Sequence, residues 1–284
     1  MERKDRDEQS IRIQSRRHYG SGFRPGPRGR DRPRSQGAEG LGRAAALELA
    51  KEGAKLSLVD LNEASLAETQ NQIKAIAPKA EVLLLTADVS NEEAVKKYVE
   101  DSLAKFGRID GFYNNAGIEG KQAPTADYDS KMFDKVIDIN LKGVFYGMKY
   151  VLPVMKEQQS GAIVNVASVG GIRGVLNQAA YVASKHAVAG MTKNAAIEYG
   201  QYNLSINAIA PGAIMTDMVV GSLKQIGGED GWEEAGKQFV SVNPKKRFGK
   251  PEEVGRLVAF LLSGESEFIN GAVIPIDGGQ SNQY

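Results

Sequence analysis

The chain has 284 residues with a formal net charge of +1, and 42% of its residues are hydrophobic. This length and composition fit one large globular α/β domain. With no cysteine and only two histidines, the sequence excludes disulfides and thiolate metal sites and gives no support for a zinc site. No apolar run approaches the ~18 residues that span a bilayer, so we expect a soluble, cytoplasmic protein without a bound metal.

Charge is distributed unevenly along the chain. Residues 1–36 carry eleven basic and five acidic residues, whereas the remainder carries more acidic than basic residues. A mildly acidic body gives no reason to expect a nucleic-acid or membrane partner. We interpret residues 1–36 as a basic N-terminal segment, disordered or aberrant, and residues 37–284 as one domain.

From residue 40 onward, amphipathic helices alternate with short apolar strands. Continuous apolar strands separated by helices of this length predict a parallel sheet covered on both faces. The fold class is therefore α/β, a single doubly wound Rossmann domain with its site at the carboxyl ends of the strands. The least regular interior stretch is glycine-rich, and we interpret its surroundings, about residues 216–245, as a substrate lid. Helices are expected over 43–52, 63–76, 91–106, 130–158, 178–202 and 251–263, and strands over 55–60, 82–88, 109–114, 162–168, 205–210 and 272–276.

A doubly wound domain normally opens with a buried strand that runs into a glycine turn. Residues 28–34, just before the first expected helix, read Arg-Gly-Arg-Asp-Arg-Pro-Arg. Unpaired buried charges there would cost several kcal/mol each, and Pro33 cannot donate to a neighbouring strand. We therefore expect the first strand to be absent or damaged in residues 19–36. Three explanations stay open: a disordered basic tail, a targeting peptide or, as we favour, a shifted reading frame.

Two features predict a nucleotide site in the first half of the domain. The segment Gly40-Leu41-Gly42 at the start of a helix lets the backbone and the helix N-terminus approach a pyrophosphate. Asp60 ends the next strand, where its carboxylate can accept hydrogen bonds from both ribose hydroxyls and repels a 2′-phosphate. A solvated strand end is the alternative for Asp60. No arginine follows this residue, so the sequence favours NAD over NADP.

A second group of residues predicts proton transfer to a carbonyl. Reduction of a ketone needs a proton for the developing alkoxide, and a phenol can supply it if a nearby cation lowers its pKa. Tyr181 and Lys185 are four residues apart in an expected helix, which places them on the same face. Ser168, at the end of the fifth expected strand, would hydrogen-bond the carbonyl oxygen.

In order and spacing, these residues resemble the signature of the short-chain dehydrogenase/reductase family. The resemblance covers about residues 40–284 and includes Asn-Asn-Ala-Gly at 114–117, Asn140, and Pro-Gly-Ala-Ile-Met-Thr at 211–216. It implies a catalytic tetrad of Asn140, Ser168, Tyr181 and Lys185. In the family, this asparagine holds a water in a proton relay behind the lysine. A buried polar residue that bends its helix is the alternative for Asn140.

The resemblance also implies which residues bind the cofactor. In the family, the aspartate after the third strand contacts the adenine amino group, although a helix-capping role is the alternative here. The family's isoleucine backbone and threonine hydroxyl after the sixth strand hold the nicotinamide carboxamide. The family's glycine turn has a threonine and a glycine where this chain has Ser35 and Gln36. The implied set is Gly40, Leu41, Gly42, Asp60, Asp88, Val89, Asn115, Ala116, Gly117, Tyr181, Lys185, Pro211, Gly212, Ile214 and Thr216.

Longer stretches, at 114–121, 167–174, 209–214 and 273–281, resemble a branch of the family that reduces cyclic ketones with NAD(H). Glu119 could orient a ligand, and a surface charge is its alternative. An apolar pocket wall is expected from residues that follow the fifth and sixth strands. The candidates are Val169, Ile172, Val175, Met215 and Met218.

Related enzymes are commonly tetramers built on two long helices, so the resemblance implies a homotetramer. An apolar helix surface could supply the contact, although the same residues could face the sheet of their own chain. The candidates are Phe133, Val136, Ile137, Val144, Met148, Ala187, Val188 and Met191.

The sequence therefore predicts hydride transfer between NAD(H) and a cyclic ketone or secondary alcohol, with Tyr181 as general acid/base. A 3-oxoacyl carrier-protein reductase shares the core motifs and is the alternative within the class. The other alternative is a non-enzymatic product whose cofactor site is damaged at its N-terminal end.

Overall fold

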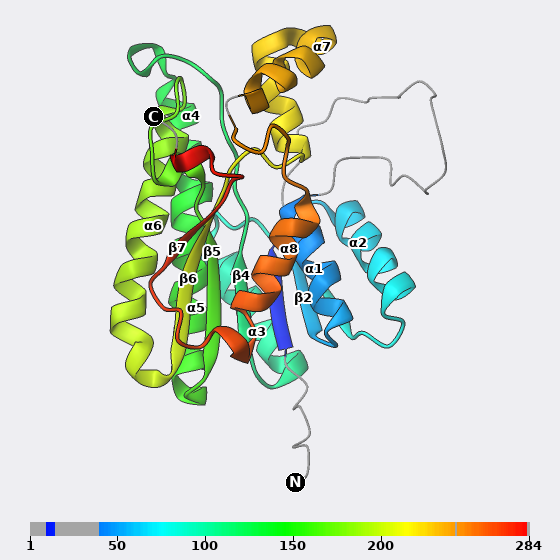
Figure 1. Ribbon diagram of the computed structural model, residues 1–284. Helices are drawn as coiled ribbons and strands as arrows, with labels where there is room; N and C mark the ends of the chain where they lie inside the picture. Colours follow the sequence, from blue (N-terminus) through cyan, green and yellow to red (C-terminus); the bar gives the residue numbers. More distant parts are fainter. Residues whose placement is uncertain (1–9, 15–39, 242, 283–284) are drawn as a thin grey trace.

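A seven-stranded parallel sheet forms the centre of the molecule (Figure 1). The computed structural model describes residues 40–241 and 243–282 and the backbone of residues 10–14. Every neighbouring pair of strands is parallel, and the strand order is β3-β2-β1-β4-β5-β6-β7. The strands are β1 (Ser10–Gln14), β2 (Lys55–Asp60), β3 (Val82–Thr86), β4 (Gly111–Asn114), β5 (Gly161–Val166), β6 (Leu204–Pro211) and β7 (Val273–Ile276).

Helices cover both faces of this sheet. The first layer contains α1 (Leu41–Lys51), α2 (Glu63–Ile76) and α8 (Pro251–Leu261). The second contains α3 (Glu92–Phe106), α4 (Ser130–Ile137), a π-helical turn (Asp138–Lys142), α5 (Gly143–Gln158) and α6 (Ala179–Tyr199). Short 3-10 turns lie at Thr125–Asp127, Val169–Gly171, Gly200–Tyr202, Gly264–Ser266 and Gln280–Asn282.

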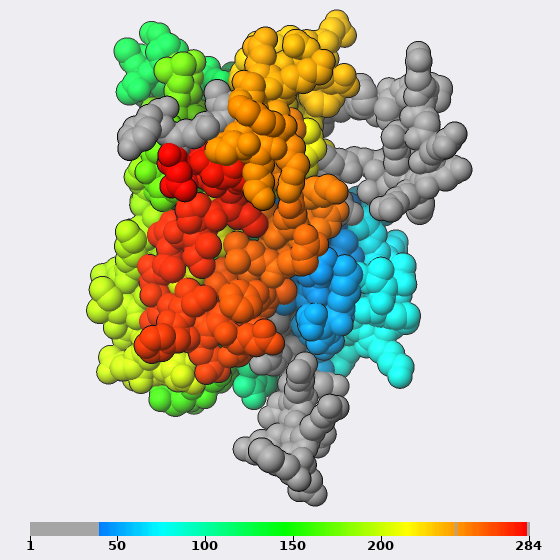
Figure 2. Space-filling view, viewed as in Figure 1, coloured from blue at the N-terminus to red at the C-terminus, as the bar shows by residue number. Residues whose placement is uncertain are grey.

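The remaining helix, α7 (Asp217–Ser241), lies beyond the carboxyl ends of the strands at the top of the view (Figure 1). In the space-filling view it forms a knob above α8 and the C-terminal segment (Figure 2). It covers most of residues 216–245, which we interpret from the sequence as a substrate lid.

Side-chain caps explain where several helices begin. Asn62, Asn91 and Asp129 each accept a hydrogen bond from the backbone N–H three residues later, at 3.1, 3.1 and 2.8 Å. Such a cap satisfies one of the N–H groups that the first helical turn leaves without a partner. The helix Glu92–Phe106 is thus capped by Asn91, and the helix at 63–76 has the bounds that the sequence predicts.

Two apolar clusters hold the layers together. On one face, Leu56 of β2 and Val258 of α8 belong to a cluster that also contains Leu49 of α1. On the other, Phe112 of β4 and Ile206 of β6 pack with residues of α3, α5 and α6. All eight residues of β6 are buried, as expected for a strand covered on both faces.

The doubly wound fold that the sequence predicts is confirmed, and one detail differs. The centre of the sheet is occupied by Ser10–Gln14, which pairs with β2 on one side and β4 on the other. The sequence there reads Ser-Ile-Arg-Ile-Gln, whose alternation is compatible with a strand. The sheet thus has a central strand, and this strand comes from upstream of residues 19–36. Residues 19–36, where the damage is predicted, lie outside the described residues.

Candidate active site

The parallel strands place the candidate site at their carboxyl edge. The strand order reverses between β1 and β4, and in doubly wound sheets a crevice forms at such a point. The segments that follow β4, β5 and β6 carry most of the residues that the sequence singles out. Helix α6 supplies the tyrosine and the lysine.

Tyr181 and Lys185 lie together on α6, one turn apart. The Nζ atom of Lys185 is 5.7 Å from the centroid of the Tyr181 ring. Lys185 is only 3% exposed, and its Nζ donates a hydrogen bond of 2.6 Å to the carbonyl oxygen of Val166, the last residue of β5. A buried ammonium group is thus anchored to the end of a strand beside a phenol.

Asn140 lies in the π-helical turn between α4 and α5 and is fully buried. Its Oδ1 accepts a hydrogen bond of 2.7 Å from the N–H of Ile118, and its Nδ2 donates one of 2.8 Å to the carbonyl oxygen of Ile118. The Nδ2 atom also donates to Ser184 Oγ at 3.1 Å. Asn140 therefore fixes the chain just after β4 and connects it to α6.

Gly117 lies where there is little room for a side chain. A methyl group added there would be 3.1 Å from Asn140 Oδ1 and 3.5 Å from Lys185 Nζ. Three of the predicted functional residues therefore meet around one backbone position, which lets the chain pass close to a ligand.

Ser168 follows β5 with an extended backbone, and its Oγ accepts a hydrogen bond of 3.1 Å from Gly170 N. The short turn that it begins packs against α6. A methyl group added at Gly170 would lie 3.4 Å from Cε1 of Tyr181, and one at Gly171 would lie 2.7 Å from the carbonyl oxygen of Lys185. The turn that carries Ser168 is thus fitted to the helix that carries Tyr181.

A pocket at the ends of β2, β3 and β4 collects five of the fifteen predicted cofactor residues. Asp60 is 3% exposed and accepts a hydrogen bond of 2.7 Å from Asn62 N. Asp88 accepts two hydrogen bonds from Ser90, at 2.9 Å from N and 2.7 Å from Oγ, so it shapes a turn and leaves the helix cap to Asn91. The pocket is lined by Asp60, Leu61, Ala87, Asp88, Val89, Ala116, Gly117, Ile118 and Ile139. Asn115 lies beside it and is 6% exposed.

The helix that should face a pyrophosphate begins at Leu41, directly after Gly40. Gly40 has an extended backbone and makes no side-chain cap bond, and Gly42 is buried. The first-turn N–H groups are therefore not occupied by a capping side chain, which is the arrangement that anions use at helix N-termini. Ser35 and Gln36 lie outside the described residues.

The segment after β6 is held by backbone hydrogen bonds. The N–H of Gly212 donates to Ile276 O at 3.1 Å, that of Ile214 to Gly212 O at 2.9 Å, and that of Met215 to Gly249 O at 3.0 Å. Thr216 is 5% exposed, and its Oγ1 accepts a long hydrogen bond of 3.4 Å from Val219 N. Pro211 is the last, buried residue of β6. The loop is rigid, and the amide of Ile214 is already engaged within it.

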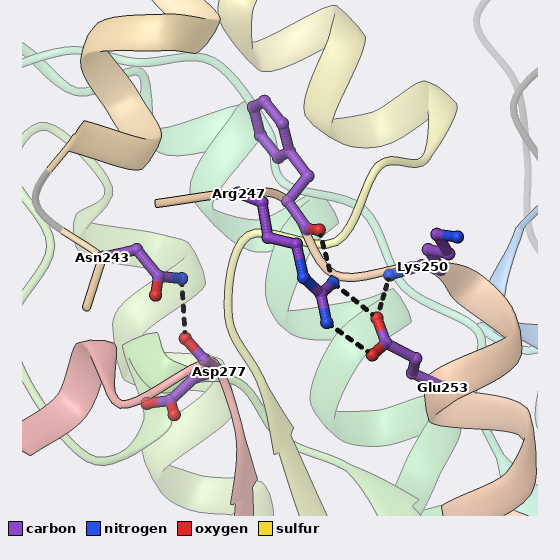
Figure 3. A network of polar contacts seen from close by, with 6 residues as sticks. Asn243, Arg247, Lys250, Glu253 and Asp277 are labelled. Carbon is purple, nitrogen blue, oxygen red and sulfur yellow. Dashed lines mark hydrogen bonds and ion pairs between the residues drawn. The ribbon is translucent and has the colours of Figure 1, made fainter. Parts of the chain in front are cut away.

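Two polar contacts fix the chain after α7 (Figure 3). Asn243 Nδ2 donates to Asp277 O at 2.9 Å. Arg247 and Glu253 form a bidentate ion pair at 2.8 and 2.7 Å, and Lys250 N donates to the same carboxylate at 2.8 Å. The Arg247 guanidinium and the Lys250 amide lower the pKa of Glu253 to about 2.

Asp277 is the centre of the C-terminal turn. Burial acts to raise the pKa of Asp277, but hydrogen bonds from Ser281 and Gly279 outweigh it and the pKa lies below its ordinary value. A methyl group added at Gly212 would lie 2.6 Å from Asp277 Cβ. The C-terminal turn therefore packs directly on the loop that follows β6.

The residues expected to form an apolar wall divide into two groups. Val169 is 5% exposed, and Met215 and Met218 are half-buried. Ile172 and Val175 are 38% and 37% exposed, so they form a rim. A methyl group added at Gly170 would contact both Val175 Cγ2, at 3.3 Å, and the Tyr181 ring, which places this rim beside the phenol.

Glu119 is half-buried and accepts hydrogen bonds from side chains of two other elements. Gln178 Nε2 donates from the position before α6, and Ser222 Oγ donates at 2.8 Å from α7. Neither Gln178 nor Ser222 belongs to the set that the sequence singles out. Both belong to no recognisable motif, so the sequence contains no signal that would reveal their contacts with Glu119.

Half of the residues considered for a subunit surface face the chain's own core. Val136, Val144, Met148 and Val188 are at most 5% exposed. Val144, Met148 and Val188 pack in the cluster that covers the sheet, whereas Val136 packs with Ile118 and Ala180. Phe133 is 37% exposed, and Ile137, Ala187 and Met191 are half-buried. The sequence could not separate these two groups of residues, because periodicity identifies an apolar face but not what covers it.

The described part of the chain has neither a helix that could span a membrane nor a metal-binding cluster. No helix there is long and apolar enough to cross a membrane. No cluster of three or more histidine and acidic side chains with metal-binding geometry occurs among the residues that the structure describes.

Comparison with known proteins identifies the family. The family model described as "Enoyl-(Acyl carrier protein) reductase" matches residues 37–281. Levodione reductase from Leifsonia aquatica is 54% identical over 248 residues, which cover 87% of this chain and 92% of that protein. Cyclohexanol dehydrogenase from an Acinetobacter species is 36% identical over 244 residues, covering 86% and 92%.

A crystal structure of levodione reductase has the same fold. It superposes with a TM-score of 0.85 at 55% sequence identity, covering 86% of this chain and 94% of that chain. The matches begin after the basic N-terminal segment and span nearly the whole length of the relatives. The chain therefore belongs to the short-chain dehydrogenase/reductase family of oxidoreductases, which act on CH–OH groups with a nicotinamide cofactor.

Proposed function

We propose that this protein transfers a hydride between NAD(H) and a cyclic ketone or its secondary alcohol. The observation that carries the proposal is the placement of the buried Lys185 ammonium 5.7 Å from the Tyr181 ring centroid. The apolar rim formed by Ile172 and Val175 lies beside this phenol. The names of two relatives, levodione reductase and cyclohexanol dehydrogenase, support a cyclic substrate.

The cofactor fits the residues present. A nicotinamide dinucleotide would place its adenosine half in the pocket lined by Asp60, Asp88 and Val89 and its ring near Ala116 and Gly117. When bound, the nicotinamide ring supplies or accepts the hydride. Its pyrophosphate would face the N-terminus of α1, and its carboxamide would lie against the loop at 211–216, by the Ile214 carbonyl and the Thr216 hydroxyl.

The chain's own residues would manage the proton. Tyr181 would donate its phenolic proton to the substrate carbonyl oxygen, and Lys185 would stabilise the phenolate that remains. Ser168 would donate a hydrogen bond to the same oxygen and so fix its position. Asn140, which joins the chain after β4 to α6, would hold the water that reprotonates the site through Lys185.

The preference for NAD rests on the charges near β2. The Asp60 carboxylate is nearly fully buried at the strand end, and a 2′-phosphate beside it would suffer like-charge repulsion. Arg43, in the first turn of α1, donates to Thr69 Oγ1 at 3.0 Å and to Ser65 Oγ at 3.4 Å. Its guanidinium is thus engaged by α2, which removes a candidate partner for that phosphate.

The test is a panel of ketones with each cofactor. Purified protein would be assayed by NADH and NADPH oxidation with substituted cyclohexanones, linear ketones and 3-oxoacyl thioesters. We expect turnover of cyclic ketones with NADH. Turnover of acyl thioesters alone would favour the carrier-protein reductase alternative and overturn the cyclic-substrate proposal.

A second candidate, a chain that does not bind the dinucleotide, is favoured by one observation. The family match begins at residue 37, and Gln36 stands where the family's glycine turn has its first glycine. Fluorescence titration with NADH separates the two candidates, because only an intact cofactor site gives saturable binding.

We also propose a cytoplasmic homotetramer with a small-molecule substrate as its only other partner. Phe145 on α5 and Ile197 on α6 are 47% and 83% exposed, which supports a subunit contact on these helices. Light scattering coupled to size-exclusion chromatography would measure the mass; a monomer would contradict the tetramer.

A further inference from the structure

The Glu119 carboxylate joins three segments that are far apart in the sequence. Its own loop follows β4. Gln178 Nε2 donates to it from the residue before α6, and Ser222 Oγ donates at 2.8 Å from the first half of α7. Gln122 Nε2 donates at 3.3 Å from the same loop. We name Glu119, Gln122, Gln178 and Ser222 the clamp.

The backbone fixes the direction in which Glu119 points. The next residue, Gly120, has a φ of +85°, in the left-handed region that favours glycine. A methyl group added there would lie 2.6 Å from Tyr128 Oη and 2.9 Å from Val136 Cγ2. The backbone therefore turns at Gly120, where it packs closely against Tyr128. The position of Glu119 is thus fixed by this backbone turn as well as by its hydrogen-bond partners.

The two sides of the clamp differ in strength. On the α6 side, the N–H of Ala123 donates to Asn177 O at 3.0 Å, and Ala123 and Gln178 form a parallel β-bridge. This backbone contact ties the Glu119 loop to the start of α6 independently of any side chain.

On the α7 side, every contact uses a side chain of α7. Gln122 Nε2 donates to Ser222 Oγ at 2.9 Å, and Gln225 Oε1 accepts from Gln122 N at 3.1 Å. The Ser222 hydroxyl thus accepts from Gln122 and donates to Glu119. Loss of this one hydroxyl would remove both of its bonds, so the α7 side is the one that can open.

The two halves of helix α7 pack against each other as one unit. The helix bends at Gly228, where φ is +75° and ψ is 178°, and its halves fold together. A methyl group added at Gly227 would lie 3.1 Å from Ala235 Cβ, and one at Gly236 would lie 3.3 Å from Leu223 Cδ1. The resulting helical hairpin encloses Leu223, which is 1% exposed.

The far root of this hairpin is fixed by the Asn243–Asp277 and Arg247–Glu253 contacts (Figure 3). We propose that Glu119, Gln178 and Ser222 are positioning residues that latch α7 over the active site and couple its closure to α6. Gln178 lies three residues before Tyr181, so a substrate-induced closure would be transmitted to the start of the helix that carries the phenol. The effect on catalysis rests on the proposed function, whereas the latch itself does not.

A carboxylate suits this role because each of its oxygens can accept more than one hydrogen bond, and Gln122, Gln178 and Ser222 all donate to Oε1 of Glu119. Bonds to an ionised acceptor are stronger than bonds between neutral groups. The clamp residues are half-buried, so water competes for them, and the latch can open when the site is empty. A fully buried network would hold α7 shut.

The first test needs no activity. Amide hydrogen exchange would be followed in peptides covering 217–227 for Ser222→Ala, for Ser222→Thr, which keeps the hydroxyl, and for Ser130→Ala, an exposed serine of α4. We expect exchange in this segment to accelerate about tenfold in Ser222→Ala only, a factor that corresponds to ~1.4 kcal/mol. Unchanged exchange in Ser222→Ala would overturn the latch, whether or not a substrate is found.

The second test addresses catalysis with a ketone that the wild-type protein reduces. Ser222→Ala should raise the KM for the ketone about tenfold, leave the NADH dissociation constant unchanged and change kcat less than twofold; Ser222→Thr should restore the KM. Faster exchange with an unchanged KM would show a loose helix that does not serve substrate binding, which refutes the role in closure.

The coupling to α6 is tested by a double-mutant cycle. In the wild-type chain, Gln178 and Ser222 donate to the same carboxylate. The double variant Gln178→Ala/Ser222→Ala should therefore raise KM by less than the product of the two single-variant factors. Multiplicative effects would overturn the coupling. If no ketone is reduced at all, the proposed function fails while the exchange experiment still decides on the latch.

Discussion

The Lys185 ammonium is held by the carbonyl oxygen of Val166 at 2.6 Å while it lies 5.7 Å from the ring centroid of Tyr181. The strand end therefore determines where the cation sits, and the helix determines where the phenol sits. Because β5 and α6 contribute to the same apolar cluster, their relative position is set by the core and not by the site itself.

Tyr181→Phe should reduce turnover by roughly 10³-fold, within the range that general acid catalysis contributes, because the phenol is the proposed proton donor. NADH binding should stay nearly unchanged, since the ring and its packing against Gly170 are retained. Steady-state kinetics and an NADH fluorescence titration measure the two effects. Turnover within tenfold of the wild type would rule out Tyr181 as the proton donor.

Asp60→Ala should shift cofactor preference toward NADPH. The substitution removes the carboxylate that would repel a 2′-phosphate and that would hold the ribose hydroxyls, so the ratio of kcat/KM for NADPH to that for NADH should rise about tenfold or more. Asn62→Ala is the matched control, because it removes the cap of α2 without changing charge. An equal ratio in both variants would contradict the assignment of Asp60.

Asn140→Ala should lower the free energy of unfolding by about 1–3 kcal/mol, since it leaves the buried N–H and C=O of Ile118 without their side-chain partner. Denaturant unfolding measures this change. A stability loss below about 0.5 kcal/mol would show that water or another group replaces the amide.

Glu253→Gln should lower the free energy of unfolding by an amount that depends on pH. The folded pKa of Glu253 is about 2 and its ordinary value is 4.5, so its stabilisation is present above pH 4.5 and is lost as the pH falls toward 2. The ion pair is partly exposed, with Arg247 at 47% and Glu253 at 31%, so we expect a difference of about 1 kcal/mol at pH 7. Thermal unfolding at pH 7 and pH 3 would compare the two proteins; a constant difference would be inconsistent with this linkage.

Local pattern was sufficient for most of the sheet and its helices. The strand Lys55–Asp60 and the helix Glu63–Ile76 have the bounds that the sequence predicts, because apolar runs and an asparagine cap are local signals. The expected single helix over 130–158 is interrupted by the π-helical turn around Asn140. That turn arises from long-range bonds to Ile118, which no local pattern encodes.

Helix α7 was not predicted from the sequence. Its glycines at 227 and 228 read as irregular structure, although they allow two helical halves to pack closely. In the site, too, local spacing could be read from the sequence and long-range contacts could not. The spacing of Tyr181 and Lys185 revealed their common face, whereas the contacts of Glu119 with Gln178 and Ser222 depend on how three loops meet.

The position of β1 has a consequence for protein engineering. This strand hydrogen-bonds on both of its sides, so a chain that begins at residue 37 would leave β2 and β4 with exposed edges that face each other. Unsatisfied strand edges recruit other chains, and such a truncated protein should therefore form aggregates on refolding. Purification tags are safer at the other terminus, because β7 pairs on one side only.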